Sequence, residues 1–261
     1  MDNLDPTAEI DESGTVVVNG VPMIVATIDD AVAFKGSSVD PGSDDVTLSW
    51  DWDDGTPNTS TEYRANPAFP DPFPSPDVNP RMVMDIQMHT FVQACLYEVG
   101  LSTVDDDGGS ATDSIWVAIL GDADQIRSSG YWYQQYRQHK AQKIGDDTLH
   151  CYLDVINFAS SVFSEERAAS TIDEAETVLT AKLAAKQPEY KLDRQLLTAW
   201  LNFANGTVAL GELIDTDGDN VPDTAFYDVM VAAETVRLNP SATKAELLAQ
   251  KDILEGFNTR G

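Results

Sequence analysis

The sequence predicts two domains of different classes: an all-β sandwich over residues 20–121 and an all-α helical bundle over residues 122–261. Two observations predict this division. As far as residue 120, apolar residues alternate with polar ones in short runs, which is the period of half-buried strands. Beyond Gly121 the apolar residues recur every three or four positions, which is the period of amphipathic helices. The 261 residues are enough for two ordinary domains.

Residues 1–19 form an N-terminal arm in this prediction. Residues 1–14 are acidic and poor in apolar side chains, so we expect a flexible segment there. The β-rich run Thr15–Val18 follows, and Asn19 and Gly20 form a turn pair. A strand at this place has two alternatives. It pairs within its own sandwich, or it is exchanged and adds to an open sheet edge of a neighbouring copy.

Several alternating runs justify the sandwich. Trp50 and Trp52 lie on the apolar side of a run that begins at Val46 and ends at the turn cluster after Gly55. Other runs bring the total to about seven strands, at the spacing of a β-sandwich: Met82, Met84, Ile86 and Met88; Cys95, Tyr97, Val99 and Leu101; Ile115, Val117 and Ile119. Six prolines between Pro67 and Pro80 cannot join a sheet ladder, so we expect an extended surface insertion there.

The C-terminal part carries the signals of helices. Thr171 and Glu174 form one capping box, and Thr243 and Glu246 form another. Apolar residues at helical spacing mark the helices themselves: Leu149, Leu153, Ile156 and Phe163; Val178, Leu179 and Leu183; Leu192, Leu196, Trp200 and Phe203; Phe226, Val229, Met230 and Ala233; Leu247, Leu254 and Phe257. Short connections between helices of this length predict an antiparallel bundle.

The charge of the chain excludes several classes of partner. There are 44 acidic and 16 basic residues, which gives a net charge of -28. Such a field repels nucleic acids and anionic lipid surfaces, so we expect neither as a partner. No apolar run approaches the ~20 residues that span a bilayer, so we expect no membrane insertion. The acidity suits divalent cations, high salt or the solubility of a secreted protein.

Five motifs follow one another in the N-terminal domain. They are Gly36-Ser37-Ser38-Val39-Asp40-Pro41, Trp50-Asp51-Trp52-Asp53-Asp54-Gly55, His89-Thr90-Phe91, Tyr97-Glu98-Val99 and Asp106-Asp107-Gly108-Gly109. In this order they resemble the polycystic kidney disease (PKD) repeat, an extracellular immunoglobulin-like β-sandwich, over roughly residues 20–120. Asp53 stands where the family usually has glycine, and the proline-rich insertion precedes His89. The resemblance implies a module that binds, spaces or assembles outside the cell.

The C-terminal domain also resembles a known kind of segment. It opens with Gly130-Tyr131-Trp132 and contains the run Arg194–Gly206. Helical segments of this kind occur at the C-termini of secreted prokaryotic proteins that carry PKD repeats. The resemblance implies a secreted context and no particular activity. No signal peptide is visible in the sequence. The chain is therefore either a mature or recombinant form of a secreted protein, which the module content favours, or a cytosolic protein.

The run 215–223 is a candidate calcium loop. Aspartates stand at its positions 1, 3, 5 and 9, and a backbone carbonyl is expected from position 7. The run resembles the loops of dockerins and thrombospondin type-3 repeats, although Phe226 stands where an EF-hand has glutamate. Including one acid of the next helix, the expected Ca²⁺ ligands are Asp215, Asp217, Asp219, Val221, Asp223 and Asp228. The alternative is an acidic N-cap before that helix.

A second calcium site is expected in the sandwich. The PKD fold tends to gather at one end the loops that carry Asp40, Asp51, Asp53, Asp105 and Asp107. Calcium bound there would offset the repulsion among these carboxylates. The alternative is a set of solvated turn aspartates.

The two cysteines, Cys95 and Cys151, are 56 positions apart and form no Cys-x-x-Cys pair, which argues against a structural zinc site. An even cysteine count in an extracellular chain predicts one disulfide. Two buried thiols are the alternative. A bond between these cysteines would tie the two domains into one rigid body.

Catalytic signals are weak. No nucleophile elbow, zinc-protease motif or phosphate loop occurs, and the histidines are His89, His139 and His150. We expect His89 to be a hydrogen-bonding residue of the sandwich. The aromatic cluster Tyr131, Trp132, Tyr133 and Tyr136 forms either part of a core or a platform for carbohydrate.

We therefore expect a non-enzymatic, calcium-stabilised structural protein outside the cell or on its surface. It would associate with copies of itself into a filament or lattice, or mediate adhesion to a surface or to a matrix polymer. The alternative is a binding accessory of a secreted hydrolase, which would grip polysaccharide or protein.

Overall fold

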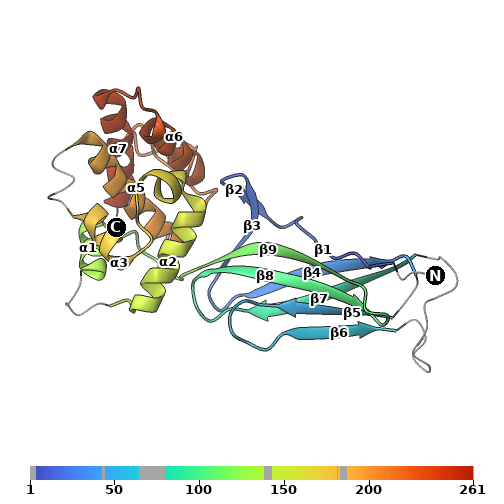
Figure 1. The fold of residues 1–261 in the computed structure, drawn as a ribbon. Helices are drawn as coiled ribbons and strands as arrows, with labels where there is room; N and C mark the ends of the chain where they lie inside the picture. The colour runs from blue at the N-terminus through green and yellow to red at the C-terminus, as the bar shows by residue number, and fades with distance from the viewer. Residues whose placement is uncertain are drawn as a thin grey trace. The chain divides into compact units, whose positions relative to one another are not determined.

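The computed structural model describes residues 4–42, 45–64, 80–137, 143–180, 182 and 187–260 of the chain. Two compact units divide the chain (Figure 1). The sandwich unit comprises Met1–Val92 and Tyr97–Ala118, and the helical unit comprises Gln93–Leu96 and Ile119–Gly261. The short segment Gln93–Leu96 therefore belongs to the helical unit, although its last residue, Leu96, begins a strand of the sandwich. The proline-rich insertion, apart from Pro80, falls outside the described residues.

Two sheets make up the sandwich unit in the described part of the chain. One sheet has the order β1-β4-β7, with β1 (Glu9–Ile10), β4 (Ala31–Asp40) and β7 (Arg81–Thr90). The other has the order β2-β3-β9-β8-β5-β6, with β2 (Val16–Val18), β3 (Val21–Thr27), β9 (Ser110–Leu120), β8 (Leu96–Asp105), β5 (Val46–Asp51) and β6 (Thr59–Tyr63). This arrangement confirms the β-sandwich that the alternating runs predict.

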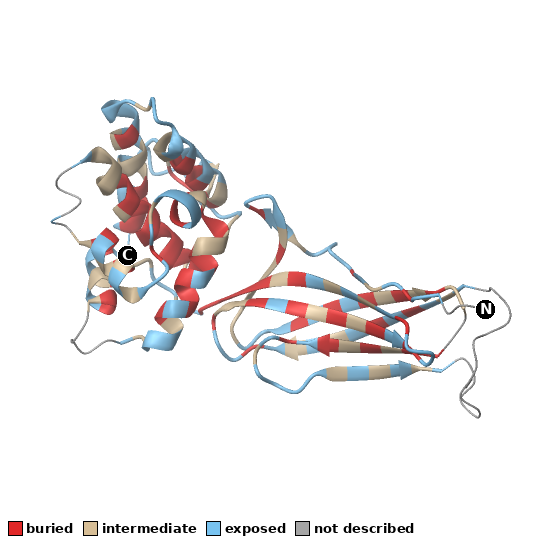
Figure 2. Cartoon of the chain, in the orientation of Figure 1, coloured by how far each residue is buried: buried red, intermediate tan, exposed pale blue. Residues whose placement is uncertain are grey.

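Aromatic side chains from both sheets fill the core of the sandwich. The ring of Phe34 on β4 lies 6.0 Å from that of Trp50 on β5 and 5.3 Å from that of Trp52. The two tryptophans stack with their ring centroids 5.8 Å apart. None of the three side chains is more than 2% exposed. The buried side predicted for the run 46–52 is therefore confirmed, and Figure 2 shows the same alternation of buried and exposed residues along the strands.

Strand β7 shows the reverse pattern of burial from β5: its apolar residues face outward, away from the core. The exposed fractions of these residues are 63% for Met82, 62% for Met84, 58% for Ile86 and 60% for Met88. The intervening positions, which are buried or half-buried, hold Val83, Asp85, Gln87 and His89. Asp85 accepts hydrogen bonds from the Trp50 indole at 2.7 Å and from the Tyr63 hydroxyl at 2.8 Å. These bonds offset the cost of burying a carboxylate, so the polar side of β7 can face the core.

Part of the N-terminal arm is a strand, contrary to the flexible segment expected there. β1 pairs with β4, and the backbone bond from Thr7 N to Val39 O, 2.9 Å long, extends this pairing. Ile10 is 5% exposed, and its N–H donates to Asp113 Oδ2 at 2.7 Å. One buried apolar side chain and these backbone bonds hold the arm to the sandwich.

Strand β2 pairs with β3 of its own sheet, which is the first of the two alternatives for this run. Asn19 and Gly20 join the two strands and have φ values of 51° and 81°. Two left-handed residues are typical of a tight hairpin turn. Val18 is fully buried. Exchange of this strand with a neighbouring copy would have to open the hairpin and expose Val18.

Helix α5 (Pro188–Ala204) is the centre of the helical unit. It packs against α1 (Ser129–Tyr136), α2 (Asp146–Ala159), α3 (Ile172–Leu179), α6 (Phe226–Leu238) and α7 (Lys244–Asn258). A π-helical turn, η1 (Val162–Glu166), follows α2. Both predicted capping boxes are present and begin α3 and α7. The apolar positions Leu196, Trp200 and Phe203 of α5 are buried, as the helical spacing predicts.

Candidate metal centre

A short β ladder closes the base of the predicted calcium loop. β10 (Leu213–Ile214) pairs antiparallel with β11 (Thr224–Ala225), and Asp223 N donates to Ile214 O at 3.0 Å. Ile214 before the loop is 2% exposed, and Phe226 after it is fully buried. The Phe226 ring lies 5.4 Å from that of Phe257 and 5.9 Å from that of Trp200. Both ends of the loop are thus fixed to the core of the helical unit.

Three of the predicted ligands lie close together. One carboxylate oxygen from each of Asp215, Asp217 and Asp223 is within 4.8 Å of the others. Carboxylate oxygens are hard donors, which Ca²⁺ prefers. Asp219 and Asp228 are exposed and lie outside this group. Asp228 is in the first turn of α6, where a negative charge favours the helix dipole.

Backbone N–H groups of the loop converge on the carboxylate of Asp215. Gly218 N donates to its Oδ1 at 2.7 Å, and Asn220 N donates to its Oδ2 at 3.0 Å. Gly218 and Asn220 have φ values of 83° and 68°, in the left-handed region that glycine and asparagine tolerate best. Val221 has an exposed side chain, and its N–H donates to Asp219 Oδ1 at 2.7 Å. These bonds set the bend that brings positions 1, 3 and 9 of the loop together.

The acidic groups of the loop suit a cation, whereas one basic group competes with it. The hydroxyls of Thr224 and Thr216 donate to Asp223 and lower the pKa of its carboxyl. A carboxylate that stays ionised is the form a metal requires. Arg260 Nη2 lies 3.1 Å from Asp215 Oδ2, so this guanidinium competes with an ion for one ligand. The donors fit a hard divalent cation held by Asp215, Asp217 and Asp223.

The aspartates of the sandwich do not gather at one end, contrary to expectation. In the pairing of β5 with β8, Asp105 lies opposite Val46 and Asp51 lies opposite Gly100. Asp51 and Asp105 are therefore at opposite ends of a strand six residues long, or roughly 17 Å. Asp40 and Asp105 are buried, while Asp51, Asp53 and Asp107 are exposed. Within the described residues, these five acids form no cluster of three that could hold a metal ion.

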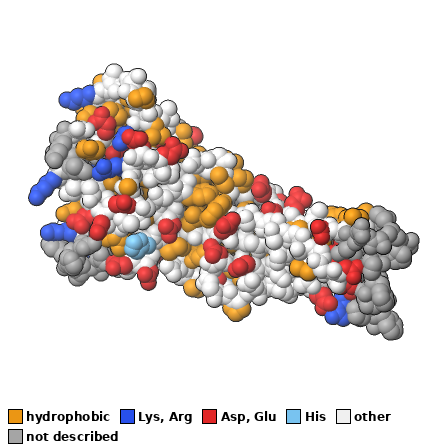
Figure 3. Space-filling view, viewed as in Figure 1, with side chains coloured by type: hydrophobic (Ala, Val, Ile, Leu, Met, Phe, Trp, Pro, Cys, Tyr) orange, Lys and Arg blue, Asp and Glu red, His pale blue; other side chains and the backbone are white. Residues whose placement is uncertain are grey.

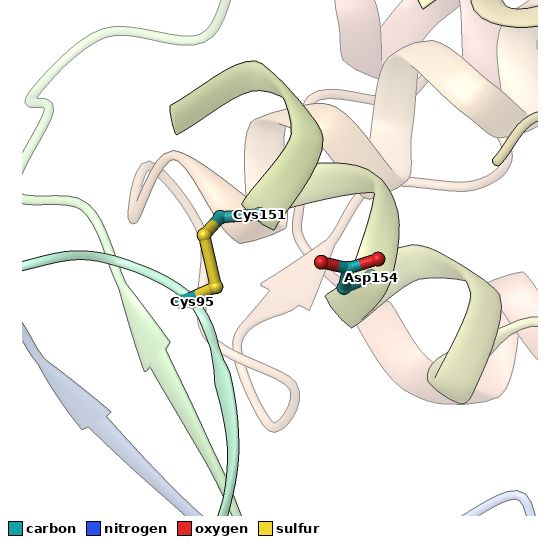
Figure 4. Close-up of side chains that lie close together, drawn as sticks. All are labelled: Cys95, Cys151 and Asp154. Atoms are coloured by element: carbon teal, nitrogen blue, oxygen red, sulfur yellow. A yellow bond between two sulfur atoms is a disulfide. The ribbon is translucent and has the colours of Figure 1, made fainter. Parts of the chain in front are cut away.

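Cys95 and Cys151 form the predicted disulfide, with their Cα atoms 4.5 Å apart, so the alternative of two thiols is wrong (Figure 4). The bond joins the segment Gln93–Leu96 to α2 within the helical unit. Gln93 Nε2 donates to Cys151 Sγ at 3.2 Å. Asp154 lies near both sulfurs, but they are bonded to each other and offer no thiolate to a metal. The rigid joining of the two domains stays a prediction.

Two of the four residues of the aromatic cluster lie in the core, and the carbohydrate platform is wrong for these two, whereas Tyr131 and Tyr133 are half-buried. Trp132 and Tyr136 are fully buried. The Trp132 indole donates to Asn202 Oδ1 at 3.2 Å, and the Tyr136 hydroxyl donates to Leu149 O at 3.0 Å. Side chains fixed in this way cannot stack on a sugar at the surface.

His89 is a hydrogen-bonding residue of the sandwich, as predicted. Its Nε2 lies 2.7 Å from Asp54 Oδ2, and its ring stacks on Trp52 with the centroids 4.3 Å apart. Burial raises the pKa of Asp54, but the bonds from Thr56 and His89 outweigh this effect and lower it. Asp54 in the motif Trp50–Gly55 is thus hydrogen-bonded to His89 in the motif His89–Phe91.

Sequence reasoning missed the buried acid Glu234 of α6, which is 7% exposed. Its carboxylate accepts hydrogen bonds from Ser160 Oγ at 2.6 Å, Ser161 N at 3.0 Å and Trp200 Nε1 at 2.8 Å. Burial raises the pKa of Glu234. The available signal was its position four residues after Met230, which places it on the apolar side of the predicted helix.

The helices in the described part of the chain lack the combination of length and apolar character needed to cross a membrane.

No family model matches the sequence, and no curated protein matches it. Among solved structures, the chain is similar to the PKD domain of an M14-like peptidase from a Thermoplasmatales archaeon. This likeness has a TM-score of 0.32 at 15% identity and covers 45% of this chain and 98% of that one.

The chain is also similar to a family 123 glycoside hydrolase from Clostridium perfringens. The TM-score is 0.29 at 12% identity, and the match covers 52% of this chain and 33% of the hydrolase. This chain thus spans about a third of the hydrolase's length. At these TM-scores, neither likeness carries an argument about family or activity.

Proposed function

We propose that this chain is a non-enzymatic, calcium-stabilised structural protein of the cell exterior. It associates with copies of itself into a filament or surface lattice, or mediates adhesion. The observation that carries the proposal is the convergence of Asp215, Asp217 and Asp223 within 4.8 Å. A Ca²⁺ ion in this loop would offset the repulsion among three adjacent carboxylates and bind both ends of the loop at once.

The position of the loop supports a stabilising role for the ion. The loop connects α5 to α6, and Arg260, which follows α7, reaches it by donating to Asp215 O at 3.2 Å. An ion that binds only the folded loop stabilises the chain by mass action. The gain is about 2.7 kcal/mol when free calcium is about 100 times the Kd.

Two features support a location outside the cell. The Cys95–Cys151 disulfide is of a kind that persists in oxidising compartments. The calcium loop is the second, because calcium-binding loops also serve in extracellular modules.

Buried ionisable groups support a structural role over a catalytic one. Glu234 has its oxygens engaged by Ser160, Ser161 and Trp200, and Asp193 forms a buried ion pair with Arg237. The binding accessory is less well supported, because Trp132 and Tyr136 belong to the core and only Tyr131 and Tyr133 of the aromatic cluster stay half-buried. We therefore retain the structural role.

The calcium loop is tested by titrating the calcium-free chain with Ca²⁺ in a calorimeter. We expect one site in the loop, and we expect Asp217→Asn to weaken its affinity roughly tenfold or more, because a ligand charge is lost. Asp217 is exposed, so the variant should fold normally. The matched control is Asp228→Asn, which also removes an exposed acid but lies outside the group. Wild-type affinity in the Asp217→Asn variant would contradict the proposal.

A further inference from the structure

The outward residues of β7 form a continuous apolar surface, here called the β7 outer face. Its members are Met82, Met84, Ile86 and Met88. The register with β4 adds neighbours to the same face: Met82 lies opposite Val39, Met84 opposite Ser37, Ile86 opposite Lys35 and Met88 opposite Ala33. Single exposed apolar residues need no explanation, but four at successive outward positions of one strand do.

The composition of the β7 outer face is that of a protein interface. Methionine is enriched at interface cores and charged residues are depleted there. On this face the paired residues of β1, β4 and β7 carry only two charges, Lys35 and Glu9, in a chain whose net charge is -28. Lys35 Nζ is 3.8 Å from Asp11 Oδ2, and its side chain is 51% exposed. The face is thus close to neutral, unlike the chain as a whole.

The low charge of the β7 outer face favours a second copy of the chain as its partner. Two copies of a strongly acidic chain repel one another over most of their surfaces. They can approach most closely through a face that carries little charge. A two-fold axis would also place Lys35 of each copy near the acids that border the same face of the other, Glu9 and Asp11. The face is therefore complementary to itself in charge and in apolar character.

The contacts at the edge of β7 favour packing of faces over addition of a strand. The Tyr63 hydroxyl of β6 donates to Met84 O at 2.9 Å, and Arg81 Nη1 donates to Tyr63 O at 3.1 Å. Tyr63 of the other sheet thus already engages this edge. Two sheets can still pack face to face at about 10 Å, which is the usual spacing between stacked sheets.

We propose that two copies of the chain pack through their β7 outer faces in an isologous, two-fold contact. The inference rests on the proposed self-association and names the surface responsible. Four side chains near 60% exposure and their small neighbours amount to a patch of a few hundred Å², compared with about 800 Å² per partner in a standard interface. The patch is the core of such an interface. An isologous contact closes into a dimer, so a filament needs a second surface.

Sedimentation of the full chain over a concentration series, with calcium present, tests the contact. We expect the wild-type chain to form a dimer. The double variant Met84→Glu with Met88→Glu should lose it, because four buried carboxylates would face one another across the two-fold axis. Both residues are more than half exposed, so the fold should persist, and near-ultraviolet circular dichroism checks this. The control is Val104→Glu on β8, at an exposed position of the other sheet.

A cysteine introduced by Met84→Cys locates the contact. Both native cysteines are in the disulfide, so this thiol is the only one in the chain. We expect a short bis-maleimide to cross-link two such chains and to leave Val104→Cys chains unlinked. If the wild type self-associates while the double variant does so equally and Met84→Cys stays unlinked, the β7 contact is overturned and self-association stands. A wild-type chain that is monomeric at every concentration overturns both.

Discussion

At the scale of single residues, Gly206 shows how closely the helical unit is packed. It follows α5 with a φ of 86°, and a Cβ atom there would lie 1.8 Å from the carbonyl oxygen of Gly121. The two segments meet through backbone bonds from Gly121 N to Ala204 O, 2.9 Å, and from Ala123 N to Asn205 O, 3.1 Å. Only a residue without a side chain allows this approach.

We predict that Gly206→Ala destabilises the chain by about 3 kcal/mol or more, because it adds a backbone clash to an unfavourable φ. Gly256→Ala is the matched control. Gly256 is exposed in α7, with nothing within 4 Å of its expected Cβ, so alanine should stabilise the helix by about 0.5–1 kcal/mol. Urea unfolding measures both variants. Equal midpoints for Gly206→Ala and the wild type would show that the approach of Gly121 is looser than described.

At the scale of elements, the disulfide fixes a connection between two strands to a helix. Gln93–Leu96 follows β7, and Cys95 in this segment is bonded to Cys151 of α2. The backbone adds a bond from Ile119 N to Cys95 O at 2.9 Å. A cross-link over 56 positions restricts the unfolded chain strongly, and chain entropy alone gives about 4 kcal/mol for a loop of this size.

We predict that replacing both cysteines by alanine lowers the free energy of unfolding by about 2–5 kcal/mol. Urea unfolding of the oxidised wild type, the reduced wild type and the double variant measures this loss. The reduced wild type and the double variant should unfold at similar urea concentrations. If all three unfold together, the bond does not constrain the unfolded chain as described.

How much the sequence predicts depends on whether an element is local. The capping boxes at Thr171 and Thr243 involve residues three positions apart, and both helix starts are confirmed. The alternation in β7 predicted the strand but could not show which side faces the core. That choice depends on partners distant in sequence, such as Trp50 and Tyr63, which pair with Asp85.

The two predicted metal sites also differ in whether their residues are close together or far apart in the sequence. Asp215, Asp217 and Asp223 are neighbours within one loop, so their spacing alone could indicate that they meet. Asp51 and Asp105 lie on different strands, and the register that separates them is set by the whole sheet. The spacing from Met230 could indicate the burial of Glu234 but not its partners, because these come from two other elements of the unit, the segment before η1 and α5.

At the scale of the whole molecule, negative charge is the dominant feature. Acidic side chains are spread over the face shown in Figure 3, and basic ones are few. A net charge of -28 favours solubility but destabilises a compact chain by self-repulsion. Salt screens this repulsion generally, whereas an ion in the calcium loop acts at one place. The two effects can therefore be separated by comparing calcium with sodium at equal ionic strength.

Thermal unfolding with metal analysis tests the central claim that calcium in the loop 215–223 stabilises the folded chain. We predict that the purified chain contains calcium, and that EDTA at constant ionic strength lowers its Tm by about 5–10 °C, the equivalent of about 2.7 kcal/mol. Asp217→Asn should abolish most of this shift, while Asp228→Asn should retain it. A Tm that EDTA leaves unchanged, in a chain that contains no calcium by elemental analysis, would contradict the account.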